Sequence, residues 1–233
     1  MIASVHLAAL GTRRGLRTYL RGAPDPVAVP GLGYSEAVLT APMGPAVLPR
    51  PTAAEVGLIA SWDDDEDLDR FLADPALAGP FASGWHVRMH PVRVFGAWPK
   101  MPGLPRQATP IADDEPVVVL TLGRPRATKL HTFLPTSARA EAALDGAAGL
   151  LASTGLAHPP RLVSTFSVWE TAAAMRAYAE DTAGPHMAAV RADRKTRFHH
   201  ESAFIRFRPY FSTGTWRGRE PLAGLVREVE TGG

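Results

Sequence analysis

The chain contains an internal repeat, and this repeat limits the possible folds more than any other feature of the sequence. The segment "VGLIASWDDDEDLDRFLADPALAGPF" (56–81) matches "LVSTFSVWETAAAMRAYAEDTAGPH" (162–186), with Trp62 aligned to Trp169. After a two-residue slip, both segments end in a Gly-Pro pair, which is followed by phenylalanine in the first and by His186 in the second. A repeat on this scale predicts two copies of one supersecondary unit.

The elements expected in each half have the same order. Each half opens with a short apolar run closed by glycine, "SVHLAALG" (4–11) and "PVVVLTLG" (116–123), which predicts a strand. The alanine- and leucine-rich "ARAEAALDGAAGLLAST" (138–154) predicts a helix. A further strand is expected at the end of each half, in "PVRVFGAW" (91–98) and "SAFIRFRPY" (202–210). This is the β-α-β-β-α-β order of a ferredoxin-like unit.

We therefore expect an α+β fold made of two ferredoxin-like (βαββαβ) halves in tandem, at 1–98 and 117–233. The segment 99–116 holds five prolines and no helical or strand period, so it is the predicted linker. Each sheet has one face covered by helices, and packing the two bare faces together closes a barrel of the dimeric α/β-barrel type. We expect the barrel interior to form the pocket. Two unrelated α+β domains are the alternative, which the shared tryptophan and Gly-Pro break make less favoured.

Composition excludes several classes of function. A formal net charge of +2 with scattered basic residues argues against a nucleic-acid partner. Cysteine is absent, which excludes disulfides, zinc-thiolate sites, iron–sulfur clusters, thiolate-ligated haem and cysteine nucleophiles. No apolar run is long enough for a transmembrane segment, and the N-terminal run is too short for a signal peptide. A cytoplasmic protein is therefore expected.

Four segments of the second half carry a resemblance: "TFSVWETAAAMRAYA" (165–179), "GPHMAAVRADR" (184–194), "ESAFIRFRPYFSTGTWRG" (201–218) and "REPLAG" (219–224). In order and spacing they resemble the C-terminal half of the spheroidene monooxygenase family, the haem-dependent carotenoid ketolases of the dimeric α/β-barrel superfamily. The superfamily also includes chlorite dismutases, dye-decolourising peroxidases and aldoxime dehydratases. The first half is similar more loosely, through "GLGYSEAVLTAPMG" (31–44) and "LIASWDDDEDLDRFLADP" (58–75). The resemblance implies haem b and oxidative chemistry, whereas the substrate has to be argued from the site.

His186 is the first candidate for the iron ligand of the implied haem. Without cysteine, the ligand is expected to be histidine, methionine or tyrosine. Pro185 suits the first position of a helix and puts His186 in the opening turn, where the helix dipole disfavours protonation and keeps the imidazole neutral for iron. A packing or capping role is the competing interpretation. His199 and His200 are the alternative ligands, but adjacent side chains point apart and both can hardly bind one metal.

Three arginines follow His186 in the same segment, at Arg191, Arg194 and Arg197. One interpretation is a solvated helix face. The other is pairing with the haem propionates, which suits the bidentate geometry of arginine. Both interpretations stay open at this point.

Arg206 and His131 are the candidate catalytic residues. The strand 202–210 alternates, with Ala203, Ile205 and Phe207 on one face and Arg206 on the other. If helices cover the first face, Arg206 points into the barrel, where it would hydrogen-bond oxygen bound above the iron. His131 lies near a predicted strand end, from which it could reach the pocket.

Three hypotheses for the function follow. The first is a haem-dependent monooxygenase that uses O2 and electrons from an external ferredoxin-type donor to hydroxylate or oxidise a hydrophobic metabolite, carotenoid-like or a natural-product intermediate. The second is a haem enzyme acting on N–O bonds, as aldoxime dehydratases do. The third is a haem-binding barrel without catalysis. A homo-oligomer is compatible with each of them, and product analysis with and without O2 separates the first two.

Overall fold

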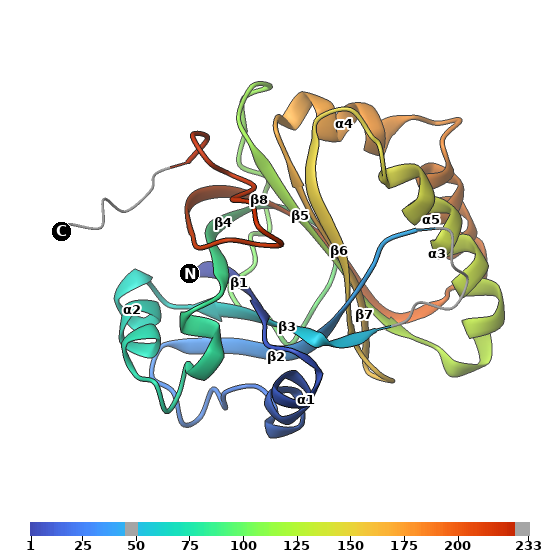
Figure 1. Cartoon of the computed structure of the whole chain (residues 1–233). Helices are drawn as coiled ribbons and strands as arrows, with labels where there is room; N and C mark the ends of the chain where they lie inside the picture. The colour runs from blue at the N-terminus through green and yellow to red at the C-terminus, as the bar shows by residue number, and fades with distance from the viewer. Residues whose placement is uncertain (45–50, 227–233) are drawn as a thin grey trace.

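The computed structural model describes residues 1–44 and 51–226, and it confirms that both halves follow the βαββαβ order (Figure 1). The first half comprises β1 (Ile2–Ala9), α1 (Thr12–Arg21), β2 (Leu32–Ala41), β3 (Thr52–Trp62), α2 (Asp65–Ala73), a short 3-10 turn (Gly79–Ala82) and β4 (Trp85–Gly96). The second half comprises β5 (Val117–Pro125), a 3-10 turn (Ala127–Lys129), α3 (Leu130–Leu144), β6 (Leu150–His158), β7 (Leu162–Trp169), α4 (Ala172–Glu180), α5 (Pro185–Thr196) and β8 (His199–Thr213).

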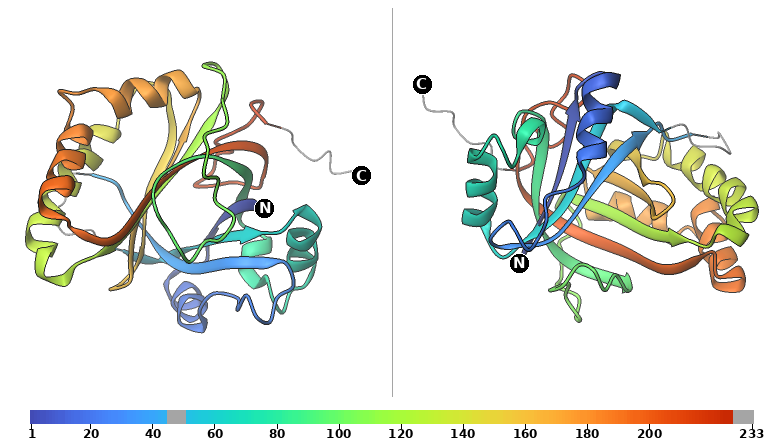
Figure 2. Two further views of the ribbon diagram at one scale, coloured as in Figure 1. Left: turned by 180° about the vertical axis from the view of Figure 1, so that it is seen from behind. Right: turned by 90° about the horizontal axis from the view of Figure 1, so that it is seen from below.

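The eight strands form one closed barrel, in the order β1-β3-β2-β6-β7-β5-β8-β4. Each half contributes four antiparallel strands, and the halves join where β4 pairs with β8 and β2 pairs with β6. The helices of the two halves lie outside the barrel on different sides, with α1 and α2 on one side and α3, α4 and α5 on the other (Figures 1 and 2). No helix in the described residues is long and apolar enough to cross a membrane.

The strand register repeats between the halves, as the sequence repeat implies. The tryptophan that ends the third strand of each half, Trp62 or Trp169, lies opposite Ile2 or Val117 in the first strand. Residues of the first strands, β1 and β5, match when they lie equally far from this pair. Residues of the last strands, β4 and β8, match when they pair with matched residues of the first strands. The matched positions used below are His6 with Thr121, His86 with Phe204, and Arg88 with Arg206.

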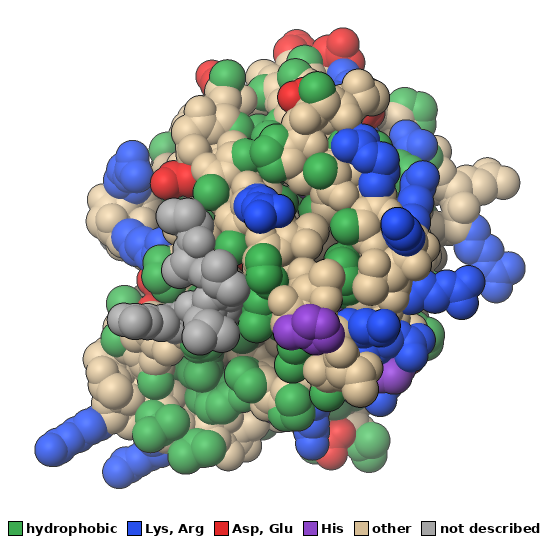
Figure 3. All heavy atoms as spheres, turned by 90° about the vertical axis from the view of Figure 1, so that its right-hand side faces the viewer, with side chains coloured by type: hydrophobic (Ala, Val, Ile, Leu, Met, Phe, Trp, Pro, Cys, Tyr) green, Lys and Arg blue, Asp and Glu red, His purple; other side chains and the backbone are tan. Residues whose placement is uncertain are grey.

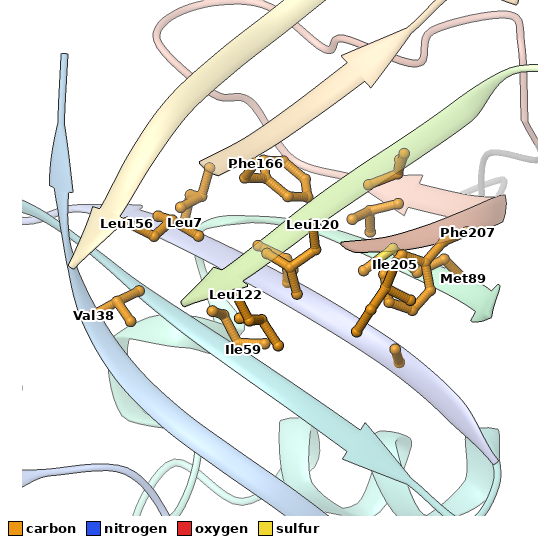
Figure 4. Close-up of a cluster of buried hydrophobic side chains, with 14 of the residues drawn as sticks. Leu7, Val38, Ile59, Met89, Leu120, Leu122, Leu156, Phe166, Ile205 and Phe207 are labelled. Atoms are coloured by element: carbon orange, nitrogen blue, oxygen red, sulfur yellow. The ribbon is translucent and has the colours of Figure 1, made fainter. Parts of the chain in front are cut away.

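The barrel interior is a packed apolar core, so the expectation that it forms the pocket is wrong. Its strands contribute buried side chains such as Leu7, Val38, Leu120 and Phe166 (Figure 4). Both ends of the barrel are filled, because segments outside the strands add side chains to the same core. Trp98 and Met101, which follow β4, fill one end, whereas Trp216 and Leu222 of the C-terminal segment fill the end where β4 begins, with Trp216 stacked 5.6 Å from Trp85.

Local signals explain where the helices begin and end. Asp64 caps α2 by accepting a hydrogen bond from the backbone N–H of Asp67, and three acidic residues occupy the first turn, where the helix dipole favours them. The helix predicted over 138–154 is wrong beyond Leu144. The chain turns at Gly146 and Gly149, both with positive φ, and then enters β6.

Candidate functional site

His186 lies at the start of α5, on the helix-covered side of the second half. Pro185 is the first residue of α5, as predicted, so His186 sits in the opening turn. The half-buried imidazole lies between two aromatic rings, with its centroid 5.4 Å from that of Tyr178 on α4 and 5.9 Å from that of Phe204 on β8. Three elements, α4, α5 and β8, therefore converge on one histidine.

Burial and a nearby cation keep this histidine neutral. The pKa of His186 is lowered from its ordinary value, first because the ring is removed from water and second because the Arg206 guanidinium repels a positive charge there. At neutral pH the imidazole is uncharged. A neutral imidazole is the form that binds a metal ion.

Arg206 faces the helices and not the barrel interior, which corrects the expected direction of its side chain. Ala203, Ile205 and Phe207 fill the barrel core, and the alternation of β8 turns Arg206 to the opposite face. Arg206 is 7% exposed there. Its guanidinium lies 5.6 Å from the centroid of the Phe95 ring, and its Nε is buried without a hydrogen-bond partner.

The matched arginine of the first half, Arg88, makes hydrogen bonds that Arg206 lacks. Arg88 donates from both terminal nitrogens to carboxylates of α2, at 2.9 Å to Asp65 and 2.5 Å to Asp69. Arg206 reaches the exposed Glu180 at 3.8 Å, too long for a hydrogen bond. The second half therefore holds a buried cation with incompletely used donors close to His186. Such a group can receive an anion or a polarised oxygen atom.

The sheet beneath α3 and α5 carries small side chains. Four of the outward-facing positions remain partly accessible even though helices lie over this face, and none of the twelve residues of α5 is buried. In the first half the matching layer is tightly filled, because Leu68 and Phe71 of α2 are fully buried and His6 takes the position of Thr121. The small outward-facing residues are Thr121, Gly123, Ser153, Gly155, Thr165 and Ser167.

The arginines that follow His186 all lie on the exposed side of α5 and at its end. The guanidinium of Arg191 donates to the carbonyl of Thr182 at 3.0 Å, which turns it back toward the start of the helix. Arg194 and Arg197 lie exposed at the other end, where Arg197 ends the helix in a left-handed conformation. Pairing of these arginines with propionates stays a prediction.

The other predicted histidines do not lie next to His186. His131 is exposed at the start of α3, the end at which Phe133 contacts Phe198 and His199 beyond the last turn of α5. A helix the length of α5 therefore separates His131 from His186. Nδ1 of His199 pairs with Asp193 at 3.1 Å, a contact that leaves Nε2 free, so ligation by His199 stays an alternative prediction.

Sequence reasoning missed the residues that surround His186. Tyr178 occupies the position in the repeat that Phe71 has in the first half, and its hydroxyl donates to the carbonyl of Ala140 at 3.0 Å. Glu141 on α3 lies near that hydroxyl, accepts a hydrogen bond from Ser137 at 2.8 Å, and has a pKa raised by burial. A polar residue replacing phenylalanine in one repeat was the available signal.

Solved structures place the fold in a known class. A crystal structure of an aldoxime dehydratase in complex with butyraldoxime matches 98% of this chain and 86% of its own, with a TM-score of 0.53 and 11% identity. A second aldoxime dehydratase structure matches 89% of this chain and 80% of its own, with a TM-score of 0.50 and 10% identity. The protein is thus an α/β barrel of paired ferredoxin-like halves. Its distinctive feature is a histidine on α5 close to a buried arginine on β8, on the helix-covered face of the second half.

Sequence relatives identify the family. The spheroidene monooxygenase of Rubrivivax gelatinosus is 31% identical over 210 residues, which cover 88% of this chain and 79% of the relative. The spheroidene monooxygenase of Rhodobacter capsulatus is 29% identical over 199 residues, or 81% of this chain and 80% of the relative. The chain belongs to the spheroidene monooxygenase family, as its sequence resemblance predicted. No protein-family model matches it.

Proposed function

We propose that this protein is a haem-dependent monooxygenase that oxidises an apolar, carotenoid-like metabolite with O2 and electrons from an external donor. Membership of the spheroidene monooxygenase family supports the monooxygenase activity and the carotenoid-like substrate. The single structural observation that carries the proposal is the pairing of neutral His186 with buried, incompletely satisfied Arg206 on the helix-covered face of the second half.

The residues around His186 fit a haem. The small side chains on β5, β6 and β7, four of them partly accessible beneath the helices, and the lack of a buried residue in α5 favour this face for a flat group between sheet and helices. His186 would hold the iron, and Arg191, Arg194 or Arg197 would pair with the propionates. A bound haem supplies the iron at which oxygen is activated.

The chain's own residues then contribute position and electrostatics. Tyr178 and Phe204 fix the imidazole plane from two sides, and the hydrogen bond from Tyr178 to Ala140 ties the aromatic ring to α3. Arg206 would provide a fixed positive charge close to His186, available to negative charge that develops at the site. Because this guanidinium is already desolvated, it stabilises such charge more strongly than an exposed arginine would.

Absorption spectra of purified protein supplied with hemin test the proposal. The wild type is expected to show the Soret band of a histidine-ligated haem, and His186→Ala is expected to lose or shift it. His199→Ala is the matched control, because His199 is half-buried at the opposite end of α5 and should leave the spectrum unchanged. Protein that stays colourless with hemin, or a spectrum that moves only in His199→Ala, contradicts the assignment.

Turnover assays separate ligand binding from chemistry. Arg206→Met is expected to keep the Soret band while lowering turnover of a carotenoid substrate by about 100-fold, the scale seen when one charge-stabilising donor is removed. Oxidised product should depend on both O2 and reductant. Product formed equally well without O2 would point to the alternative chemistry at N–O bonds.

A further inference from the structure

The surface around α1 is unusually apolar for exposed protein. In the part of the chain that the structure describes, six large hydrophobic side chains are exposed, and four of them belong to α1 and to the segments beside it. These four are Leu16 (45%), Leu20 (72%), Val27 (94%) and Leu77 (40%). The segments adjoin one another, because one groove of about 230 Å³ is lined by residues of α1, of the loop that follows it and of the turn after α2.

Arginines accompany these hydrophobic side chains. Arg13, Arg17 and Arg21 follow one another at a spacing of four residues and form one row on α1, and Leu16 and Leu20 form the neighbouring row. The helix has no acidic residue. Arg21 donates to the carbonyl of Ala76 at 2.7 Å, while Arg13, Arg14 and Arg17 are exposed. In Figure 3, hydrophobic side chains and outlying Lys or Arg side chains gather at the lower end of the molecule, where Figure 1 draws α1.

The helix cannot turn these leucines inward. Gly15 packs so closely on β3 that a Cβ atom there would lie 1.7 Å from the carbonyl oxygen of Ala53. This contact fixes which face of α1 meets the barrel. Leu16 and Leu20 therefore stay outward, and their burial requires another molecule.

We propose that the α1 surface, formed by Arg13, Leu16, Arg17, Leu20 and Val27, docks the protein on an anionic lipid bilayer. The leucines and the valine would enter the boundary between headgroups and acyl chains. The arginines would meet lipid phosphates while their aliphatic stems cover apolar surface. This places the enzyme at the phase that holds an apolar substrate.

Charge favours a bilayer over a second copy of the chain as the occupant. A symmetric dimer through this surface would bring two rows of arginines together, and Asp25, the nearby exposed acid, already accepts a hydrogen bond from the backbone of Val27 at 2.9 Å. An anionic membrane instead provides many negative charges and brings no second row of arginines close to the first. The inference draws its biological purpose from the proposed function, but it can be tested without turnover.

Vesicle sedimentation of the full-length protein tests the proposal. The wild type is expected to sediment with vesicles of phosphatidylcholine and phosphatidylglycerol, and much less with phosphatidylcholine alone or at high salt. Leu16→Gln/Leu20→Gln should lower the partition coefficient by at least about tenfold, because two exposed aliphatic side chains no longer enter the bilayer. Leu225→Gln is the control, since Leu225 is nearly as exposed as Leu16 (40% against 45%) but does not belong to the α1 surface.

The charge contribution has its own pair of variants. Arg13→Gln/Arg17→Gln should weaken binding to the anionic vesicles and reduce its salt dependence. Arg106→Gln/Arg219→Gln makes the same change in net charge at two exposed arginines elsewhere and should leave binding unchanged. Equal sedimentation of both double variants would mean that net charge, and not this surface, attracts the protein, and the proposal would be overturned.

Two further outcomes would overturn the docking surface. One is wild-type protein that stays in the supernatant with every vesicle. The other is a wild-type dimer in light scattering that Leu16→Gln/Leu20→Gln converts to monomer. The α1 variants should keep the Soret band and the turnover of detergent-dispersed substrate. A protein that binds vesicles but lacks haem or turnover would leave the docking surface standing and refute the proposed function instead.

Discussion

Two stacked histidines in the first half are expected to make the fold sensitive to acid. The rings of His6 and His86 lie 4.9 Å apart beneath the 3-10 turn, and both side chains are buried. Both ring nitrogens of His86 and Nδ1 of His6 lack a hydrogen-bond partner in the described residues. Burial, followed by repulsion from Arg88, lowers the pKa of His86 to about 4, and the pKa of His6 is also well below its ordinary value.

The sign and size of the effect follow from this pKa. As pH falls below about 6.5, the unfolded chain takes up a proton on His86 before the folded chain can, so acid favours unfolding. The stability associated with neutral His86 is therefore complete above about pH 6.5 and is lost as the pH falls to about 4. A pKa lowered from 6.5 to about 4 corresponds to roughly 3 kcal/mol of unfolding free energy at ~1.36 kcal/mol per pH unit.

The variant His86→Phe removes this titration. Phenylalanine is the residue that the second half carries at the matched position, Phe204, so the substitution has a precedent within the same fold. Urea unfolding followed by tryptophan fluorescence, from about pH 7 to about pH 4, should show the wild type losing roughly 3 kcal/mol more than the variant. His131→Phe, at an exposed position, should follow the wild type. Parallel pH profiles for the wild type and His86→Phe would refute the reasoning.

Two stability predictions follow from the packing. Trp216→Ala opens the filled end of the barrel beside Trp85 and should lower the unfolding free energy by about 3–5 kcal/mol in denaturant titrations, a loss that an unchanged midpoint would contradict. Gly15→Ala places a Cβ against the carbonyl of Ala53 and should cost more than about 2 kcal/mol by the same measurement, whereas Arg17→Ala at an exposed position of α1 should cost less than about 1 kcal/mol.

The overall fold could be read from the sequence because the repeat carries it. The tryptophans and the Gly-Pro breaks mark the same places in both halves, and the register of the strands agrees with that alignment. The orientation of β8 could not be read, because both of its faces bear large apolar side chains, Phe204 outside and Phe207 inside. Alternation predicts two faces but does not say which one meets the helices.

The candidate site was predictable only in part. His186 could be identified because it replaces Phe81 in the repeat, whereas the sequence does not show that Arg88 and Arg206 occupy matched positions. The second half inserts the complete helix α5 where the first half has a short turn, so the two arginines differ in their sequence distance from the matched tryptophans. Only strand pairing aligns them. The aromatic neighbours Tyr178 and Phe204 likewise depend on tertiary contacts that no local pattern encodes.

Joining both halves in one polypeptide frees them from having to be identical. A barrel assembled from two copies of one subunit must repeat every substitution on both sides, so a residue useful for chemistry is also imposed where it is harmful. Here both terminal nitrogens of Arg88 bind aspartates of α2, while the matched Arg206 makes only a 3.8 Å contact with Glu180 and lies close to an imidazole. The asymmetry leaves one arginine to stabilise the fold and the other available for the proposed chemistry.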